Sequence, residues 1–328
     1  MSETKITVAV GINDRTLPLL AGLVAIDDAA ATFVTAPLEE IFARGFDEQA
    51  FDVTELSFSN YLYLIATGDS PYVGLPIFPS RSFRHSAIYV RTDRGITGPR
   101  DLAGRLVGVR EYSMTAALVA RGVLDDDFGV RAQDIRWCYG RADAKDSQPI
   151  ARMMPRDVEL EVIDADRTLS DMLAAGDIDA MIAYKPPPVF LEGHAQVGRL
   201  FEDYPAIERD YARRSGIFPI MHLIGIRREL ARQRPELAVN ICRGFDAARR
   251  YAFDRLAESQ ALFTMLPWGA QQAADAVSAL GDDFWAYGLP PNRPAIEALC
   301  RYSFAQGISP REVVPEELFA HETLDWRS

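Results

Sequence analysis

The chain has 328 residues, of which 48% are hydrophobic and 25% are charged, and its formal net charge is −12. This length suffices for two domains of moderate size. A strongly acidic chain is a poor partner for nucleic acid or for an anionic membrane surface, so we expect neither. A local cationic cluster in such a chain is informative, because an anionic ligand would need one.

The N-terminal residues, Met1 to Val10, run directly into an alternating, strand-like segment. They lack the pattern of a secretory signal, which is a basic region followed by an apolar region and a small-residue cleavage site. No apolar stretch of the chain approaches the roughly 18 residues of a membrane span. The three cysteines, Cys138, Cys242 and Cys300, are odd in number and far apart, which is no disulfide framework. These features predict a cytoplasmic protein, and they leave a homo-oligomer open.

The first part of the chain alternates between strands and helices. The pattern predicts strands over 5–10, 32–35, 52–56, 74–78 and 87–90, with helices over 17–24, 37–44 and 61–67 between them. Ser57 or Ser59 is expected to cap the third of these helices. Such alternation is typical of an α/β fold with a mostly parallel sheet.

A polar segment rich in Gly and Pro, 91–104, then indicates a crossing between domains. A second α/β unit follows, with strands over 105–110, 135–139, 158–163 and 180–184 and helices over 113–124 and 169–175. The prolines 186–188 end it, and a long strand over 219–226 is predicted to return the chain to the first domain. Helices follow over 228–231, 235–256, 270–280 and 294–306. We therefore predict a two-lobed α/β protein with a cleft between its lobes and a helical C-terminus, in which lobe 1 is 1–90 plus 220–328 and lobe 2 is 91–219.

The segment 78–86, Phe-Pro-Ser-Arg-Ser-Phe-Arg-His-Ser, is the most informative stretch of the chain. Arg81 and Arg84 present planar, charged groups that suit a carboxylate. His85 can transfer a proton near neutral pH. A solvated surface loop is the alternative, but Phe78 and Phe83 favour a packed loop.

Ligands of open α/β sheets bind beyond the carboxyl ends of the strands, so other residues at predicted strand ends are candidates as well. The helix starts near Ser59 and Thr115 present free backbone N–H groups that attract a carboxylate, and simple helix capping is the alternative for each of them. Glu111 can accept or donate a proton, or it can be a solvated loop carboxylate. His222, within an apolar strand, is either a buried structural histidine or a residue aimed at the cleft.

Several familiar motifs are absent. The chain has no phosphate-binding glycine loop, no dinucleotide fingerprint, no serine nucleophile elbow and no zinc-binding spacing of Cys and His. We therefore predict no metal ligands, while a divalent metal stays open.

Taken together, several segments resemble the 4,5-dihydroxyphthalate decarboxylase family. They are Asp14-Arg15-Thr16, Phe58 to Tyr61, Pro76 to Val90, Asp101 to Ala116, and Ile135-Arg-Trp, which cover mainly the first half of the chain. The resemblance implies a type 2 periplasmic-binding-protein-like fold. It also implies that an aromatic dicarboxylate, 4,5-dihydroxyphthalate above all, loses CO2 to give protocatechuate without an organic cofactor.

Such a substrate has each carboxylate para to a hydroxyl. Deprotonating that hydroxyl pushes electron density onto the carbon bearing the carboxylate, and a proton delivered there lets CO2 leave. On this hypothesis His85 protonates the carbon, and Glu111 or His222 acts on the phenol. The expected substrate-binding residues, with the two arginines of 78–86 on the spectator carboxylate, are Arg15, Ser59, Asn60, Arg81, Arg84, Tyr112, Thr115 and Lys185. Two alternatives stay open, another lyase reaction on this fold and a non-catalytic binding protein for aromatic carboxylates.

Overall fold

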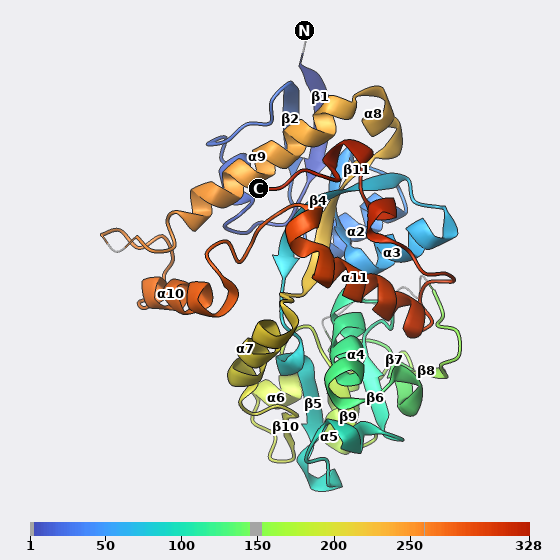
Figure 1. Cartoon of the computed structure of the whole chain (residues 1–328). Coiled ribbons are helices and arrows are strands. Elements are labelled where there is room, and N and C mark those ends of the chain that lie inside the picture. The colour runs from blue at the N-terminus through green and yellow to red at the C-terminus, as the bar shows by residue number, and fades with distance from the viewer. Residues whose placement is uncertain (1–2, 145–152, 259) are drawn as a thin grey trace. The chain divides into compact units, whose positions relative to one another are not determined.

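The computed structural model describes residues 3–144, 153–258 and 260–328 (Figure 1). The chain divides into two compact units, which we call unit 1 and unit 2. Unit 1 consists of Met1–Arg81, Ala212–Glu297 and Val313–Ser328, and unit 2 of Ser82–Tyr211 and Ala298–Glu312. The sequence predicts crossings after residues 90 and 219 and places 298–312 in the first lobe. The segment 82–90 lies in unit 2 because the strand that it leads into pairs with two other strands of that unit.

Unit 1 is built on a five-stranded sheet in the order β2-β1-β3-β11-β4. β1 runs parallel to β2 and to β3, whereas β11 is antiparallel to both β3 and β4. The sheet is therefore mixed, because β11 brings the chain back into it from the opposite direction. Its strands are β1 (Thr4–Ala9), β2 (Ala29–Val34), β3 (Val53–Ser57), β4 (Tyr72–Arg81) and β11 (Ile220–Arg227).

Helices cover the unit 1 sheet, and α9 packs against α1 and β4 (Figure 1). The buried Tyr61 hydroxyl donates to the Leu318 carbonyl and accepts from the Gly74 N–H at 2.7 Å, which ties α3 to β4 and to the C-terminal segment. The Tyr72 hydroxyl makes one such bond, to the Phe51 carbonyl at 2.9 Å. The helices are α1 (Leu17–Leu20), α2 (Leu38–Phe46), α3 (Phe58–Thr67), α8 (Arg228–Gln233), α9 (Pro235–Phe253) and α10 (Gly269–Leu280).

Unit 2 is built on a six-stranded sheet in the order β10-β5-β9-β6-β7-β8. β6 is parallel to β7 and β9, and β7 to β8, whereas β5 is antiparallel to β9 and β10. Its strands are β5 (Ile88–Arg91), β6 (Leu106–Val109), β7 (Arg136–Tyr139), β8 (Leu160–Val162), β9 (Ala180–Ile182) and β10 (Val197–Arg199).

The longest helix within unit 2, α4 (Thr115–Phe128), is fastened to residues 298–305 of α11 (Leu289–Ala305). Arg301 makes two hydrogen bonds to the Asp126 carboxylate, at 2.8 and 2.7 Å, and Tyr302 donates to the same group. The other helices are α5 (Leu169–Ala175), α6 (Pro188–Leu191) and α7 (Tyr204–Ser215).

Three element boundaries differ from the prediction in ways that affect the site. β4 extends to Arg81, because it is an edge strand that pairs with β11 along its length and so tolerates its prolines. α3 begins at Phe58 rather than Tyr61, with Ser57 at the N-cap position and no side-chain cap bond, so Ser59 and Asn60 are helical. α11 begins at Leu289, which places Pro294 inside the helix.

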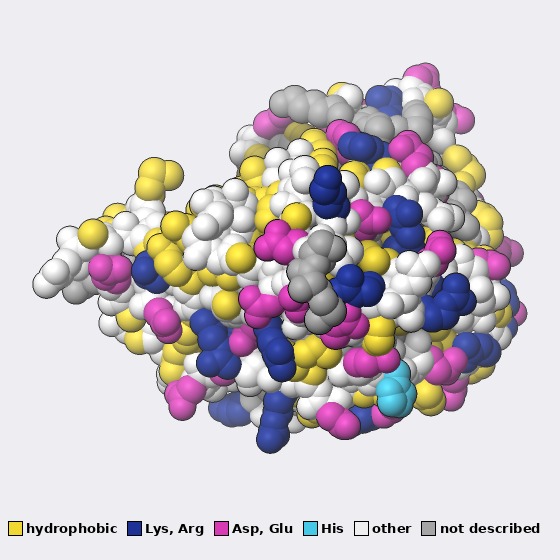
Figure 2. Space-filling model, turned by 90° about the horizontal axis from the view of Figure 1, so that it is seen from above, with side chains coloured by type: hydrophobic (Ala, Val, Ile, Leu, Met, Phe, Trp, Pro, Cys, Tyr) yellow, Lys and Arg dark blue, Asp and Glu magenta, His cyan; other side chains and the backbone are white. Residues whose placement is uncertain are grey.

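No helix among the described residues combines the length and the apolar character that a membrane span needs. On the face shown in Figure 2, acidic and basic side chains are interspersed rather than gathered by sign. That face offers no concentrated cationic surface to a polyanion.

Candidate active site

Unit 1 brings its predicted site residues to one edge of its sheet. β1, β3 and β4 end at this edge and β11 begins there, because β11 runs antiparallel to β3 and β4. The register pairs His222 with Ser57 on one side and with Ser80 on the other. The predicted residues at or just beyond this edge are Arg15, Ser59, Asn60, Arg81 and His222.

The His222 imidazole forms a pair with a glutamate that the sequence analysis did not single out. Nδ1 of His222 lies 2.7 Å from Oε1 of Glu55, and the second oxygen, Oε2, accepts the Gly11 N–H at 2.9 Å. Glu55 is 1% exposed, and the Phe42 ring meets the imidazole edge to face, with 4.9 Å between the ring centroids. An imidazole held by a carboxylate in this way is oriented for proton transfer through its other nitrogen.

A signal for Glu55 exists in the sequence. It lies in the middle of β3, a five-residue strand in which every residue is buried. Carboxylates are almost never fully buried unless they are paired, so a glutamate in such a strand predicts a partner from elsewhere in the fold.

Arg15 and Asn60 are placed differently from each other. The Arg15 Nε donates to the Pro79 carbonyl at 3.1 Å, and its guanidinium lies 4.1 Å from the centre of the Trp285 ring. Asn60 lies in the first turn of α3 and is 8% exposed, and its Oδ1 has no hydrogen-bond partner among the described residues. A buried amide oxygen of this kind is available to a donor such as a ligand hydroxyl. Ser59 beside it is fully buried.

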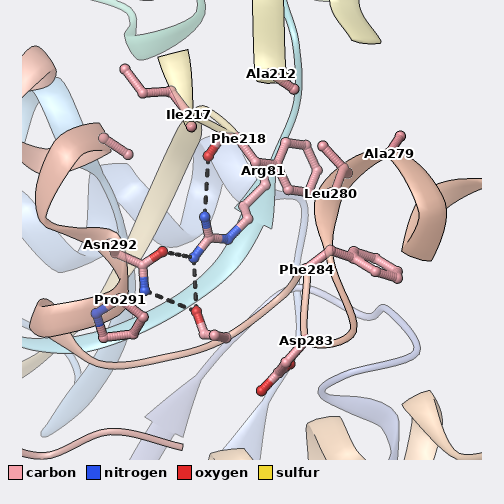
Figure 3. Close-up of a pocket in the computed structure, with 13 residues that line it drawn as sticks. Arg81, Ala212, Ile217, Phe218, Ala279, Leu280, Asp283, Phe284, Pro291 and Asn292 are labelled. Carbon is pink, nitrogen blue, oxygen red and sulfur yellow. Dashed lines mark hydrogen bonds between the residues drawn. The ribbon is translucent and has the colours of Figure 1, made fainter. Parts of the chain in front are cut away.

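Arg81 projects into a cavity of about 180 Å³ within unit 1 (Figure 3). Its guanidinium donates to the carbonyls of Phe218 at 3.1 Å and Ala286 at 2.9 Å, and to Oδ1 of Asn292 at 2.5 Å. Its Nε is buried and has no hydrogen-bond partner in the part of the chain that the structure describes. Burial lowers the pKa of Arg81 to about 9.

Most of the residues that line this cavity are apolar in type, with the rings of Phe218 and Phe284 among them, although more of the exposed lining surface is polar than apolar (Figure 3). Asp283 also lines it, but that carboxylate is bonded to Arg249. The three acceptors that bind the Arg81 guanidinium are all uncharged, so these hydrogen bonds do not neutralise its positive charge.

Unit 2 also gathers its predicted residues at one edge of its sheet, where β6 and β9 end and β5 begins. The predicted residues there are Arg84, His85, Glu111, Tyr112, Thr115 and Lys185. His85 is 1% exposed, and its ring centroid lies 5.5 Å from that of Phe201 and 5.2 Å from that of Tyr211. Burial lowers the pKa of Arg84 to about 10, against the opposing attraction of Glu208.

The remaining residues of unit 2 are held by neighbours of their own. Glu111 pairs with Arg110 at 2.9 Å, and the half-exposed Lys185 pairs with Asp143 at 3.2 Å. The Tyr112 hydroxyl donates to the Gln306 carbonyl at 3.2 Å, and its ring stacks under the buried guanidinium of Arg121, 3.7 Å from the ring centre. This geometry gives Tyr112 a packing role in the core of unit 2. Thr115 is the buried first residue of α4.

Within residues 3–144, 153–258 and 260–328, no three or more His, Cys, Asp or Glu side chains gather in the manner of a metal site. The candidate chemistry that the described residues offer is that of the His222–Glu55 pair, the buried Arg81 and the partly buried Arg84.

The protein consists of two α/β units, each built on a mixed sheet, and its fold is of the periplasmic-binding-protein-like class. The structure is similar to that of the periplasmic aliphatic sulphonate binding protein SsuA from Escherichia coli, with a TM-score of 0.53, 13% identity, and coverage of 99% of this chain and 100% of that one. At such low sequence identity the structural similarity shows the fold alone, and this similarity confirms the predicted fold class.

No family model matches the chain. It is, however, 39% identical over 326 residues to the 4,5-dihydroxyphthalate decarboxylase of Comamonas testosteroni, and the aligned region covers 99% of both chains. It is also 40% identical over 214 residues to the 4,5-dihydroxyphthalate decarboxylase of Pseudomonas putida, and this aligned region covers 65% of this chain and 83% of that one. The chain belongs to the 4,5-dihydroxyphthalate decarboxylase family, and the predicted family is confirmed.

Proposed function

We propose that this protein is a carboxy-lyase that removes one carboxylate of a hydroxylated aromatic dicarboxylate, and that its substrate is 4,5-dihydroxyphthalate. The observation that carries the proposal is the 39% identity to a decarboxylase of that name over 99% of both chains. The products would be protocatechuate and CO2.

The cavity at Arg81 suits a substrate of this kind. A cavity of roughly 150 Å³ accepts a benzene molecule. The Arg81 cavity, at about 180 Å³, therefore has room for an aromatic ring, and the substituents of that ring would reach beyond it. Its Phe218 and Phe284 rings provide apolar walls for an aromatic ring, and the Arg81 cation attracts a carboxylate. We assign the spectator carboxylate to Arg81, with one bond from Nε, because both hydrogens of Nη2 are used within the protein.

The proton on the phenol is assigned to the His222–Glu55 pair. This pair does not line the Arg81 cavity itself, but His222 lies at the same sheet edge as Arg81. Nε2 of His222 takes the phenol proton, and the electron pair of the O–H bond moves into the ring. An acid, for which His85 is the candidate from the sequence, protonates the ring carbon that bears the leaving carboxylate. The bond from this carbon to the carboxylate then breaks, its electrons restore aromaticity as CO2 departs, and the phenolate regains the proton held by His222. The overall change is the loss of CO2 and the gain of one proton at the ring carbon.

The predicted role of His85 as the proton donor to the ring carbon is the weaker assignment on geometric grounds. His85 packs among aromatic rings and is nearly inaccessible, whereas the His222 side chain is 17% exposed and oriented by a carboxylate. A positioned acid or base contributes about 10² to 10⁴-fold in rate. We therefore expect His222→Gln to lower kcat by at least about 100-fold. A comparable fall in kcat for His85→Gln, with stability and KM unchanged, would restore His85 as the donor.

The primary experiment mixes the purified protein with 4,5-dihydroxyphthalate and follows CO2 release and protocatechuate formation, with and without a chelator. Turnover that survives the chelator supports acid–base decarboxylation without a metal. Turnover that the chelator abolishes and a divalent ion restores would add a metal to the proposal. Tight binding without turnover favours a binding protein or a different aromatic acid, which a panel of hydroxybenzoates separates.

A further inference from the structure

We propose that Glu55, together with the backbone N–H of Gly11, is a positioning device that fixes the tautomer of His222 and leaves Nε2 as the proton-accepting nitrogen. The consequence for catalysis rests on the proposed function, whereas the tautomer itself does not depend on it. Glu55 contributes no group to the substrate and acts through His222.

Both oxygens of Glu55 face a hydrogen-bond donor. Oε1 lies 2.7 Å from Nδ1 of His222, and Oε2 accepts the Gly11 N–H at 2.9 Å. An ionised carboxylate has acceptors alone, so the nitrogen that faces it must carry the proton. In the neutral ring Nδ1 is then protonated and Nε2 has the free lone pair that a general base needs.

The Gly11 N–H is itself held in place. The Gly11 carbonyl accepts the Thr16 hydroxyl at 2.7 Å, so the loop after β1 is fixed on both sides of this residue. A Cβ at position 11 would lie 2.9 Å from Cδ2 of Leu38 and 3.3 Å from Oε2 of Glu55. Glycine at this position therefore lets the backbone approach the carboxylate closely.

One further ring contact and both strand partners of His222 are uncharged residues. Phe42 of α2 meets the ring edge to face at 4.9 Å, and the strand partners on β3 and β4 are Ser57 and Ser80. Within the described residues, the titratable side chain that faces the ring from these elements is Glu55. The protonation pattern of His222 should thus follow the chemistry of this one carboxylate.

Replacing the carboxylate by an amide of the same shape should invert the tautomer. In Glu55→Gln the amide oxygen must face the fixed Gly11 N–H, so the amide NH₂ faces Nδ1 of His222. Nδ1 must then accept a hydrogen bond, and the ring proton moves to Nε2. A histidine in that form cannot take the phenol proton through Nε2; the equivalent acid-to-amide change in the Ser-His-Asp triad lowers kcat about 10⁴-fold.

A matched control is available in the same unit. The Asp52 carboxylate accepts the Thr7 N–H and the Thr7 hydroxyl, both at 2.9 Å, and pairs with Arg227 at 3.4 Å; none of these interactions involves His222. Asp52→Asn is therefore the same chemical change at a neighbouring position, with an expected loss of stability and no expected change in the tautomer of His222.

The test records ¹⁵N shifts of the histidine rings in the wild-type protein, Glu55→Gln and Asp52→Asn. The chain has four histidines, and His222→Gln assigns the signals of this one. We expect the Nδ1–H form in the wild type and Asp52→Asn, and the Nε2–H form in Glu55→Gln. The Nε2–H form in the wild type, or an unchanged tautomer in Glu55→Gln, would overturn the proposal.

Kinetics provide a second readout. Glu55→Gln should lower kcat by at least about 100-fold with KM within about threefold, and its kcat should not recover at any pH between 5 and 9. A kcat within about threefold of that of Asp52→Asn would overturn the proposal. If the wild type shows no turnover, the proposed function fails, and the tautomers alone decide the role of Glu55.

Discussion

Arg81→Lys tests whether the buried arginine of the unit 1 cavity serves both the fold and a carboxylate ligand. Arg81 donates hydrogen bonds to Phe218, Ala286 and Asn292 from two different nitrogens. A lysine ammonium is a single point donor and cannot span these acceptors. The Ala286 carbonyl keeps its bond from Asn292 at 2.9 Å, but at least one of the other acceptors is left unpaired.

The expected loss of stability follows from those bonds. Hydrogen bonds to a charged group contribute about 1.5–3 kcal/mol each, and a buried acceptor left without a partner costs about 1–3 kcal/mol. With one of the three bonds remade by the ammonium, we expect the free energy of unfolding to fall by about 2–4 kcal/mol. Affinity for phthalate should fall about tenfold or more, because Nε is lost and the charge moves away from the ring-sized space.

Arg121→Lys is the matched control. Arg121 is also buried, in unit 2, and its guanidinium donates to Gln306 Oε1 at 2.6 Å and to the Tyr112 carbonyl at 2.7 Å. It does not line the Arg81 cavity. Urea unfolding and calorimetric titration with phthalate should show both variants destabilised, but only Arg81→Lys weakened in binding. Wild-type affinity in Arg81→Lys, or an equal loss in Arg121→Lys, would refute the assignment of the carboxylate to Arg81.

Two further predictions concern stability. Tyr61→Phe removes a hydroxyl with two buried hydrogen bonds and should lower the free energy of unfolding in urea by about 2–4 kcal/mol. Tyr72→Phe removes one such bond and should lower it by about half as much. Equal losses in the two variants would contradict this prediction. The second prediction concerns Asp126. Burial alone would raise the pKa of this carboxyl group, but hydrogen bonds from Arg301 and Tyr302 hold the pKa below its usual value. A carboxylate whose pKa is lowered in the folded state contributes stability at neutral pH and loses that contribution as the pH falls through its folded pKa. Asp126→Asn should therefore cost about 1 kcal/mol at pH 7, and the difference from the wild type should shrink below about pH 4; a difference that is constant down to pH 2.5 would refute the ion-pair account.

Local patterns in the sequence were sufficient for the fold class and the family. Period-two strands alternating with helical segments predicted the α/β architecture, since both periodicities arise from neighbours along the chain. The string 78–86 and the segments around it resembled the decarboxylase family, to which the chain belongs. The rule that ligands bind beyond strand ends also selected residues that each unit gathers at one sheet edge.

The chemistry of individual site residues depended on contacts across long stretches of chain. The Glu55–His222 bond joins residues 167 positions apart, and the acceptors of Arg81 lie up to 211 positions away. No local pattern encodes such partners, because they meet only where β11 inserts between β3 and β4 and where 286–292 closes over Arg81. The residues at strand ends could therefore be predicted from the sequence. The pairing of His222 with the buried Glu55 was decided by the tertiary structure, because only the folded chain determines which polar groups share a buried space.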